Sequence, residues 1–398
     1  MRTRTVAIIG GGPAGAMAAA RLAAGSSLRH NSGGLRVLVL QDKMGWEKPC
    51  GGGLTHKALR RYPFLADTAK GANLLREAEF IASTGTAMRV RLREPLAIYP
   101  RTMLDGFLLR RAAEAGAEIV NDRVLGVTRK DSHWELAGRD AGYRADFAVL
   151  AAGARSRLRQ VFADDFGPRD FMLTLGYHLP VDCERLRVQF YEKFEGYAWA
   201  FPRADHVSVG VCGKAGDVPM TALRERLAEF LRKHGYAPDR QRIFSHLLPS
   251  LTVDSWAALR LAGPGWALVG DAAGLVDPLT GEGIYYAMRS GELLAEALLD
   301  DFPEDYPERV RNEFGRALAQ GARMARMFYH GEFAGAAITT RMIELGAQSR
   351  ALLDLIQDLI EGVNSYPELL ARIQVGLARA LLDVGRSRLS AAFALHLG

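Results

Sequence analysis

Short apolar runs alternate with glycine-rich and polar segments at the start of the chain. Residues 6–9 (Val-Ala-Ile-Ile) and 35–40 (Leu-Arg-Val-Leu-Val-Leu) predict buried strands. Residues 13–24 between them predict a helix, and residues 25–34, rich in Ser, Asn and Gly, predict a surface loop. A strand, a helix and a second strand in this order predict a βαβ unit with parallel strands.

The same alternation continues through the rest of the chain. Helical spacing dominates from about residue 284 to the end. Before that point the pattern predicts strands at 79–82, 87–92, 118–120, 145–150 and 266–269, a meander near 124–136, and helices at 102–115 and 220–234.

The first glycine-rich segment is Gly10-Gly11-Gly12-Pro13-Ala14-Gly15, directly after the first strand. Gly10 permits a tight turn, Gly12 allows close approach of a pyrophosphate, and Gly15 allows close helix–strand packing. The N-terminus of the following helix supplies N–H groups for phosphates. The segment predicts a dinucleotide site; an ordinary glycine-rich turn is the alternative.

The residue after the second strand departs from this motif. An Asp or Glu is expected there to bind a ribose, and the chain has Gln41, whose amide oxygen accepts without charge. Asp42 follows, but strand alternation directs it to the other face.

A second glycine-rich segment, Gly270-Asp271-Ala272-Ala273-Gly274, follows the strand at 266–269 and leads to Gly281 and Gly283. Asp271 can accept hydrogen bonds from ribityl hydroxyls at the carboxyl end of a strand. Backbone N–H groups at Gly281 and Gly283 can stabilise negative charge on a reduced flavin. A structural helix cap is the alternative. Together the two segments predict FAD.

The order of the segments predicts an α/β protein with a discontinuous FAD-binding domain of Rossmann-like type. Its parts are residues 1–75, 98–168 and 255–300, and an inserted sheet-rich domain for substrate comprises 76–97 and 169–254. Residues 301–398 form a C-terminal helical region.

Composition excludes several classes of protein. The chain of 398 residues has a net charge of +6, without a basic run interleaved with aromatics, so no nucleic-acid partner is expected. Three cysteines form no disulfide framework and no metal motif, which favours a reducing, cytoplasmic compartment and no metal. No apolar run is long enough for a membrane-spanning helix.

Three further motifs resemble the geranylgeranyl reductase family, within the p-hydroxybenzoate hydroxylase-like superfamily of FAD oxidoreductases. Residues 48–54 (Lys-Pro-Cys-Gly-Gly-Gly-Leu) are similar to its KxCGGG loop. Arg101 with Asp105 resembles its RxxxD helix, and residues 197–202 with Gly210 resemble its YxWxFP-x7-GxG signature. Departures are Cys212 for the last Gly of that signature, Phe194 for a proline before the Tyr, and Ala152 for the Asp of the superfamily's DG segment.

The resemblance implies a glutathione reductase/hydroxylase-type fold, FAD, and an electron donor that is either NAD(P)H or a ferredoxin-like redox partner. It also implies the remaining site residues. Those for the cofactor are Cys50, Gly51, Arg101 and Val124, those for catalysis are Cys50, Tyr197 and Trp199, and those for substrate are Tyr197, Trp199 and Phe201.

Each of these side chains also has a plainer interpretation. A thiol in a flexible glycine-rich loop can donate a proton near the flavin, but Cys50 can equally be a structural cysteine. Tyr197, Trp199 and Phe201 share one strand face and can form either a substrate cleft or core. Arg155, Arg157 and Arg159 suit a phosphate or a solvated face, the latter being favoured.

The tail predicts two amphipathic helices, at 352–363 and after Pro367. The second repeats Arg372, Arg379 and Arg386, which suits either anionic lipid at the inner membrane face or packing on the body. The predicted function is reduction of C=C bonds in a prenyl substrate. The rivals are a flavin monooxygenase or halogenase, although the halogenase WxWxIP sequence is absent, and a non-enzymatic electron-transfer flavoprotein.

Overall fold

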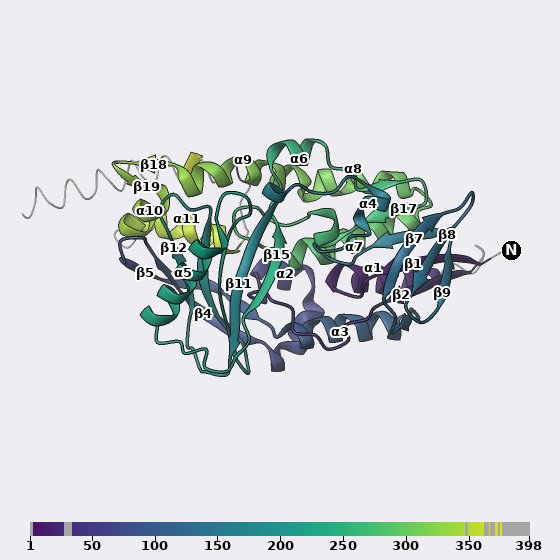
Figure 1. Cartoon of the computed structure of the whole chain (residues 1–398), viewed down its shortest axis with the longest axis horizontal. Coiled ribbons are helices and arrows are strands. Elements are labelled where there is room, and N and C mark those ends of the chain that lie inside the picture. The colour runs from purple at the N-terminus through teal and green to yellow at the C-terminus, as the bar shows by residue number, and fades with distance from the viewer. Residues whose placement is uncertain are drawn as a thin grey trace, which may run out of the picture. The chain divides into compact units, whose positions relative to one another are not determined.

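The computed structural model describes residues 3–27, 34–346, 349–361, 366, 371–372 and 375 (Figure 1). The chain forms two compact units, one of residues 1–48, 100–172 and 246–322, the other of 49–99, 173–245 and 323–398. Residues 301–322 group with the first unit and the later described residues with the second, where the sequence predicted one separate helical region. The functional division into domains stays a prediction.

The first unit is an α/β unit. Its elements are β1 Arg4–Ile9, α1 Pro13–Ser27, β2 Leu35–Leu40, α3 Arg101–Glu114, β6 Glu118–Val120, β7 Val124–Arg129, β8 Trp134–Gly138, β9 Gly142–Ala145, β10 Phe147–Leu150, α4 Arg159–Phe162, α6 Val253–Ala257, β16 Ala262–Gly263, β17 Trp266–Leu268, the 3-10 turn η3 Gly270–Ala273, α7 Ile284–Leu299, α8 Tyr306–Val310 and the π-helical turn η5 Arg311–Gly315, with short 3-10 turns η2 Pro168–Asp170 and η4 Pro303–Asp305.

Its main sheet has the strand order β16-β17-β10-β1-β2-β6. All neighbours pair in parallel except β16 and β17. The apolar runs read from the sequence form its centre, since Ala7, Ile8 and Val39 are fully buried. The strands β7, β8 and β9 form a separate antiparallel sheet, as the predicted meander requires.

The helices α1 and α7 of this unit pack so closely that their backbones are in contact. A Cβ atom at Gly291 of α7 would lie 2.1 Å from the carbonyl oxygen of Ala14 in α1. Helix α1 runs to Ser27, so Gly25 is helical and the loop predicted from that residue begins later; residues 28–33 lie outside the described part.

The second unit is sheet-rich. Its elements are β3 Gly53–Leu54, α2 His56–Arg61, η1 Pro63–Gly71, β4 Asn73–Ile81, β5 Ala87–Ile98, β12 Leu186–Phe190, β13 Gly196–Pro202, β14 Val207–Lys214, α5 Met220–Lys233, β18 Glu332–Phe333, β19 Ala336–Ala337, α10 Ile338–Gly346 and α11 Arg350–Glu361. The strands β11 Phe171–Leu179 and β15 Phe244–Pro249 and the helix α9 Arg316–His330 run across the boundary between the units.

A mixed sheet of order β15-β11-β14-β13-β12-β4-β5-β3 forms the core of the second unit. Helix α5 covers one face of it, where Leu223, Leu227 and Phe230 pack with Ala198 and Ala200 of β13 (Figure 1). The other face of β13 is therefore the one that carries Tyr197, Trp199 and Phe201.

The C-terminal part departs from the predicted continuous helical pattern. A short hairpin of β18 and β19 interrupts it between α9 and α10. The first predicted tail helix corresponds to α11, whose Asp358 pairs with Arg93 of β5. Most of the second, including Arg379 and Arg386, lies outside the described residues, so the predicted membrane contact stays a prediction.

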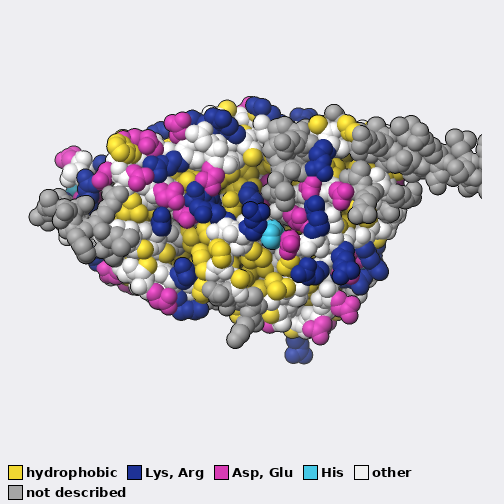
Figure 2. All heavy atoms as spheres, turned by 180° about the vertical axis from the view of Figure 1, so that it is seen from behind, with side chains coloured by type: hydrophobic (Ala, Val, Ile, Leu, Met, Phe, Trp, Pro, Cys, Tyr) yellow, Lys and Arg dark blue, Asp and Glu magenta, His cyan; other side chains and the backbone are white. Residues whose placement is uncertain are grey.

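Two features of the surface bear on partners. On the face shown in Figure 2, Lys and Arg side chains are interspersed with Asp and Glu instead of forming one basic area. Within the residues that the structure describes, no helix is both long and apolar enough to cross a bilayer.

Candidate active site

The first glycine-rich segment forms a tight turn between β1 and α1. Gly10 has a φ of +107°, and a Cβ atom there would lie 2.5 Å from the carbonyl oxygen of Ala151. A Cβ atom at Gly15 would lie 2.0 Å from the carbonyl oxygen of Gly10, so the fold itself requires both glycines. Gly12 differs, because a Cβ atom there would meet nothing within 4 Å. The open space above Gly12 lies beside the N-terminus of α1, where Pro13 begins the helix.

Gln41 is tied to this turn by its side chain. Its Oε1 atom accepts a hydrogen bond of 2.8 Å from the N–H of Gly11, and its Nε2 atom donates to the carbonyl oxygen of Lys43 at 3.1 Å. The amide therefore holds the glycine-rich turn in place. Its predicted contact with a ribose stays a prediction.

The second glycine-rich segment lies against the first. The turn η3 begins at Gly270, whose φ is +58°, and a Cβ atom there would lie 2.9 Å from the Cβ of Ala14. The N–H of Gly270 donates to Ser290 Oγ of α7 at 3.0 Å. The fold thus brings together the two segments that the sequence singled out.

Asp271 forms an ion pair that sequence reasoning missed. Its Oδ2 atom lies 2.6 Å from Lys48 Nζ, and the two side chains are 11% and 19% exposed. Burial opposes ionisation of Asp271, but the charge and hydrogen bond of Lys48 hold its pKa below the ordinary value. Lys48 belongs to the KxCGGG loop, so its place in that motif was the available signal.

Charged side chains near this ion pair also act on His246. Burial, together with the charges of Lys48, Arg155 and Arg101, lowers the pKa of His246 to about 3, against the effect of Asp271. His246 is therefore neutral near pH 7. Arg101 lowers the pKa of Asp271 as well, although its guanidinium is itself paired with Asp105.

The three arginines after β10 have different positions. Arg155 and Arg157 are exposed, whereas Arg159 is buried. Arg159 donates from Nη1 to the carbonyl oxygen of Ala272 at 2.6 Å, and its guanidinium lies 3.7 Å from the ring centre of Phe166. Neither interpretation of the cluster holds for Arg159, because it supports the turn that carries Asp271.

The segment between η3 and α7 is a closed turn. The carboxylate of Asp277 accepts from the N–H groups of Leu279 and Thr280, at 2.8 Å and 3.1 Å. The N–H of Gly281 donates to the carbonyl oxygen of Asp277 at 2.9 Å and so stabilises the turn, and its contact with a flavin stays a prediction. Gly283 directly precedes α7, whose first-turn N–H groups have no partners within the helix.

Arg101 and Val124 are also placed in the first unit. Arg101 is buried and donates to both carboxylate oxygens of Asp105 at 2.9 Å. Glu47 accepts from the N–H groups of Arg101 and Thr102, at 2.9 Å and 3.0 Å, which fixes the start of α3. Val124 begins β7. Their contacts with a cofactor stay predictions.

The residues of the first unit fit a bound dinucleotide. The space at Gly12 is open, whereas Gly10 and Gly15 are closed by backbone. The N-terminus of α1, which begins at Pro13, supplies N–H groups of the kind that bind a phosphate. These groups would hold the pyrophosphate and the ribityl chain of FAD.

Cys50 lies in the second unit, in a loop fixed by close packing. Its Sγ atom accepts a hydrogen bond of 3.1 Å from the N–H of Gly52, whose φ is +80°. A Cβ atom at Gly51 would lie 2.3 Å from the ring of Phe201, and one at Gly52 would lie 2.2 Å from the carbonyl oxygen of Tyr99. Only glycines allow this loop to lie against β13 and Tyr99.

The aromatic strand β13 is partly covered. Trp199 is 5% exposed, and its ring occupies the space that a Cβ atom at Gly210 would need, 2.3 Å away. Tyr197 and Phe201 are half-buried. Cys212 pairs with Tyr197 across the strands, and burial raises the pKa of its thiol to about 12. Trp199 is thus largely core, and the two half-buried rings are better candidates for substrate contact.

The predicted site residues therefore form two groups, one in each unit. The first joins both glycine-rich segments with Gln41, Asp271 and Lys48. The second joins Cys50 and Gly51 with Phe201.

Comparisons with known proteins agree with the resemblance seen in the motifs. A profile of the family described as FAD dependent oxidoreductase matches residues 93–297. The chain is 30% identical over 317 residues to the digeranylgeranylglycerophospholipid reductase of Methanosphaerula palustris, covering 74% of this chain and 76% of that protein. It is 29% identical over 331 residues to the chloroplastic geranylgeranyl diphosphate reductase of Nicotiana tabacum, covering 75% and 67%. It is also 29% identical over 366 residues to the menaquinone reductase of Mycolicibacterium smegmatis, covering 82% and 85%.

Solved structures show the same fold. A geranylgeranyl bacteriochlorophyll reductase-like protein from Thermoplasma acidophilum superimposes with a TM-score of 0.75 at 21% identity, covering 94% of this chain and 99% of that one. A flavin-dependent brominase has a TM-score of 0.71 at 18% identity, covering 97% and 100%. The profile match and the 30% identical relative assign the family: the chain belongs to the geranylgeranyl reductase family of FAD-dependent oxidoreductases.

Proposed function

We propose that this protein reduces C=C double bonds in the prenyl chain of a lipid or quinone substrate. The proposal rests on one observation: the compounds after which the relatives are named share a chemical group. Geranylgeranyl diphosphate, digeranylgeranylglycerophospholipid and menaquinone have different head groups, and each carries a prenyl chain. The common element is therefore the chain.

The first unit supplies the cofactor site. When bound, FAD supplies the hydride for the reaction. Gly12 and the N-terminus of α1 would hold the pyrophosphate. Asp271 would hold the ribityl chain, and it is itself positioned by Lys48 and by the turn that Arg159 supports.

The second unit supplies the residues for the alkene. An isolated C=C bond has no polar group to be held by, so its orientation depends on apolar contact. Tyr197 and Phe201 provide half-buried aromatic surface on β13. Holding the reacting carbon in place lowers the barrier by several kcal/mol through proximity.

One carbon of the alkene must receive a proton. The loop that carries the Cys50 thiol packs on Phe201, one of the two half-buried rings of this surface. We assign to Cys50 the role of proton donor, with Tyr197 as the next candidate.

The alternative is a flavin-dependent halogenase or monooxygenase. The likeness to a brominase structure, at 18% identity, concerns the fold alone. The strand β13 has Tyr197 and Phe201 where the halogenase sequence has Trp and Ile. A halogenase also needs O₂, whereas a reductase turns over without it.

A single experiment separates these functions. The purified protein is photoreduced without oxygen and mixed with a short prenyl diphosphate or a prenylated quinone. A reductase reoxidises its flavin and returns a product heavier by two hydrogen atoms per reduced bond. Reoxidation only after admission of O₂ and bromide, with a brominated product, would overturn the proposal.

A companion experiment addresses the head group and the electron donor. Mass spectrometry of lipids and quinones from cells with and without the gene identifies the compound whose unsaturated prenyl chain accumulates when the gene is missing. Flavin reduction by NADPH, NADH or reduced ferredoxin identifies the donor.

A further inference from the structure

The carbonyl oxygen of Cys50 is held by two buried side chains from another part of the chain. Ser208 donates to it from Oγ at 2.9 Å, and Arg203 donates to it from Nη2. Ser208 is fully buried and Arg203 is 4% exposed. Two donors on one carbonyl fill both of its acceptor positions.

Both donors come from one hairpin. Arg203 directly follows β13 and Ser208 lies in β14, and the N–H of Arg203 donates to the carbonyl oxygen of His206 at 2.7 Å. The indole of Trp199 donates from Nε1 to Ser208 Oγ at 3.4 Å. A chain of hydrogen bonds thus leads from the aromatic strand through Ser208 to Cys50.

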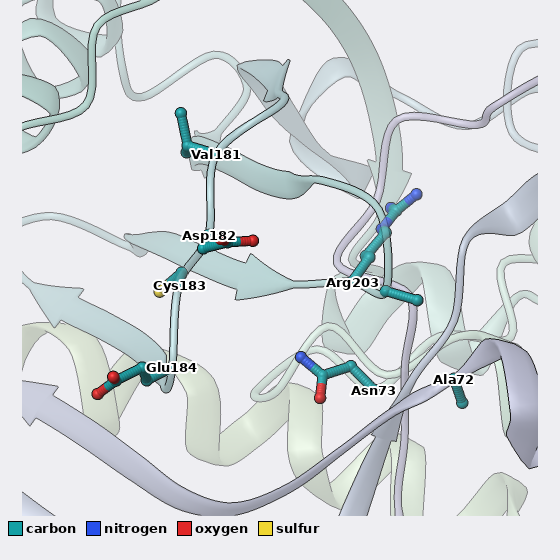
Figure 3. A pocket seen from close by; sticks show the side chains of 8 residues that line it. Ala72, Asn73, Val181, Asp182, Cys183, Glu184 and Arg203 are labelled. Atoms are coloured by element: carbon teal, nitrogen blue, oxygen red, sulfur yellow. The ribbon is translucent and has the colours of Figure 1, made fainter.

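Arg203 also borders a polar cavity of about 300 Å³ with Asn73, Asp182 and Glu184. Figure 3 shows the guanidinium of Arg203 turned away from Asp182 and Glu184. Burial lowers the pKa of Arg203 to about 10, against the opposing effect of Asp205, so the side chain is still charged near pH 7. Arg203 is thus a buried cation that donates to a main-chain carbonyl of the Cys50 loop.

We propose that Ser208 and Arg203 are positioning residues that hold the Cys50 loop so that its thiol has one orientation. The carbonyl is fixed by the hairpin, and the N–H of Gly52 fixes Sγ at 3.1 Å. The thiol is then ordered before substrate binds, which preserves the geometry that proton donation needs. This inference rests on the proposed role of Cys50.

The first test measures the thiol itself. The FAD-loaded protein is treated with iodoacetamide, and modification of Cys50 is followed by peptide mass spectrometry, with the half-buried Cys183 as internal reference. Ser208→Ala should raise the Cys50 rate about threefold to tenfold, the scale of one lost hydrogen bond. Thr174→Val, which removes a buried hydroxyl from the neighbouring strand β11, should leave it unchanged. Equal rates in Ser208→Ala and wild type would overturn the proposal.

The second test asks whether Ser208 acts through Cys50. Ser208→Ala should slow alkene reduction by reduced enzyme about tenfold with KM and flavin reduction unchanged, and Arg203→Lys should keep more activity than Arg203→Met. In a Cys50→Ser background, Ser208→Ala should have no further effect. A full additional loss in that background would contradict positioning.

The two tests separate failure of this inference from failure of the proposed proton donor. If Cys50→Ser retains full alkene reduction, the donor assignment is wrong, and the alkylation rates alone decide whether the hairpin orders the loop.

Discussion

The cofactor region of the first unit and the Cys50 loop of the second unit depend on glycine in opposite ways. At Gly12 the missing side chain leaves open space, where we propose that the cofactor binds. At Gly51 the missing side chain is replaced by the ring of Phe201, 2.3 Å from where a Cβ atom would be. The first glycine leaves space for the proposed cofactor, and the second makes room for the protein itself.

This difference predicts which substitutions affect function without affecting the fold. A side chain in open space harms only what binds there. A side chain in filled space displaces the surrounding strand first. The predictions below test this distinction, from the largest expected effect to the smallest.

Gly12→Val should abolish FAD retention and leave the apoprotein folded. The new side chain would occupy the open space where we place the pyrophosphate, and the loss of hydrogen bonds to a charged group should weaken binding by about a hundredfold or more. Released flavin is measured by absorbance, and folding by circular dichroism. Gly15→Val is the matched control, because its Cβ would lie 2.0 Å from the carbonyl oxygen of Gly10 and should unfold the unit. Retained FAD in Gly12→Val would show that the open space is not the cofactor site.

Cys50→Ser should slow alkene reduction by about 10² to 10⁴, the usual contribution of a general acid. Serine is close in size but much less acidic, so the fold, FAD content and flavin reduction should persist. Stopped-flow measurement of the two half-reactions separates the effects. Unimpaired reoxidation by substrate would make Cys50 structural, and loss of FAD would make the loop a binding element.

Lys48→Met should destabilise the first unit by about 3 kcal/mol, because it leaves the buried carboxylate of Asp271 without its cation. Adding Asp271→Asn to Lys48→Met should recover much of that loss of stability, and the double variant should still bind FAD weakly. Urea unfolding of both variants and FAD titration provide the measurement. Equal stability of Lys48→Met and wild type would show that the ion pair contributes nothing.

The pH dependence should be smaller. His246 has a pKa near 3 when folded and 6.5 ordinarily, so the unfolded chain binds the proton more tightly. The contribution of His246 to stability is therefore present above pH 6.5 and is lost as the pH decreases, by about 1.6 kcal/mol between pH 6.5 and 5. His246→Gln should reduce the change of the urea midpoint with pH between pH 6.5 and 5. An unchanged pH dependence would assign the acid sensitivity to other groups.

The sequence predicted the first region better than the second. Gly10, Gly12 and Gly15 serve a backbone geometry that few other sequences allow, so their spacing alone indicated the turn and the ligand. The parallel strands also followed from uninterrupted apolar runs, as in Val6–Ile9.

Contacts between distant side chains were not predictable in this way. Nothing near Lys48 in the sequence indicates a carboxylate at position 271, and nothing near Cys50 indicates Ser208 or Arg203. The same holds for Arg159, which has the composition of a phosphate-binding cluster but a buried structural role. Burial is decided by the folded chain as a whole, so local pattern could not distinguish Arg159 from the exposed Arg157.

The close contact of Gly291 with Ala14 has a consequence for how the protein is made. The central strand β1 needs β10 on one side, β10 needs β17, and α1 needs α7. A ribosome that has released only the N-terminal glycine-rich turn has therefore exposed a motif without the partners that complete it. We therefore expect FAD to be acquired only after the chain beyond residue 291 has emerged, so that a yellow, FAD-bound protein is one in which nearly all of the first unit has been synthesised.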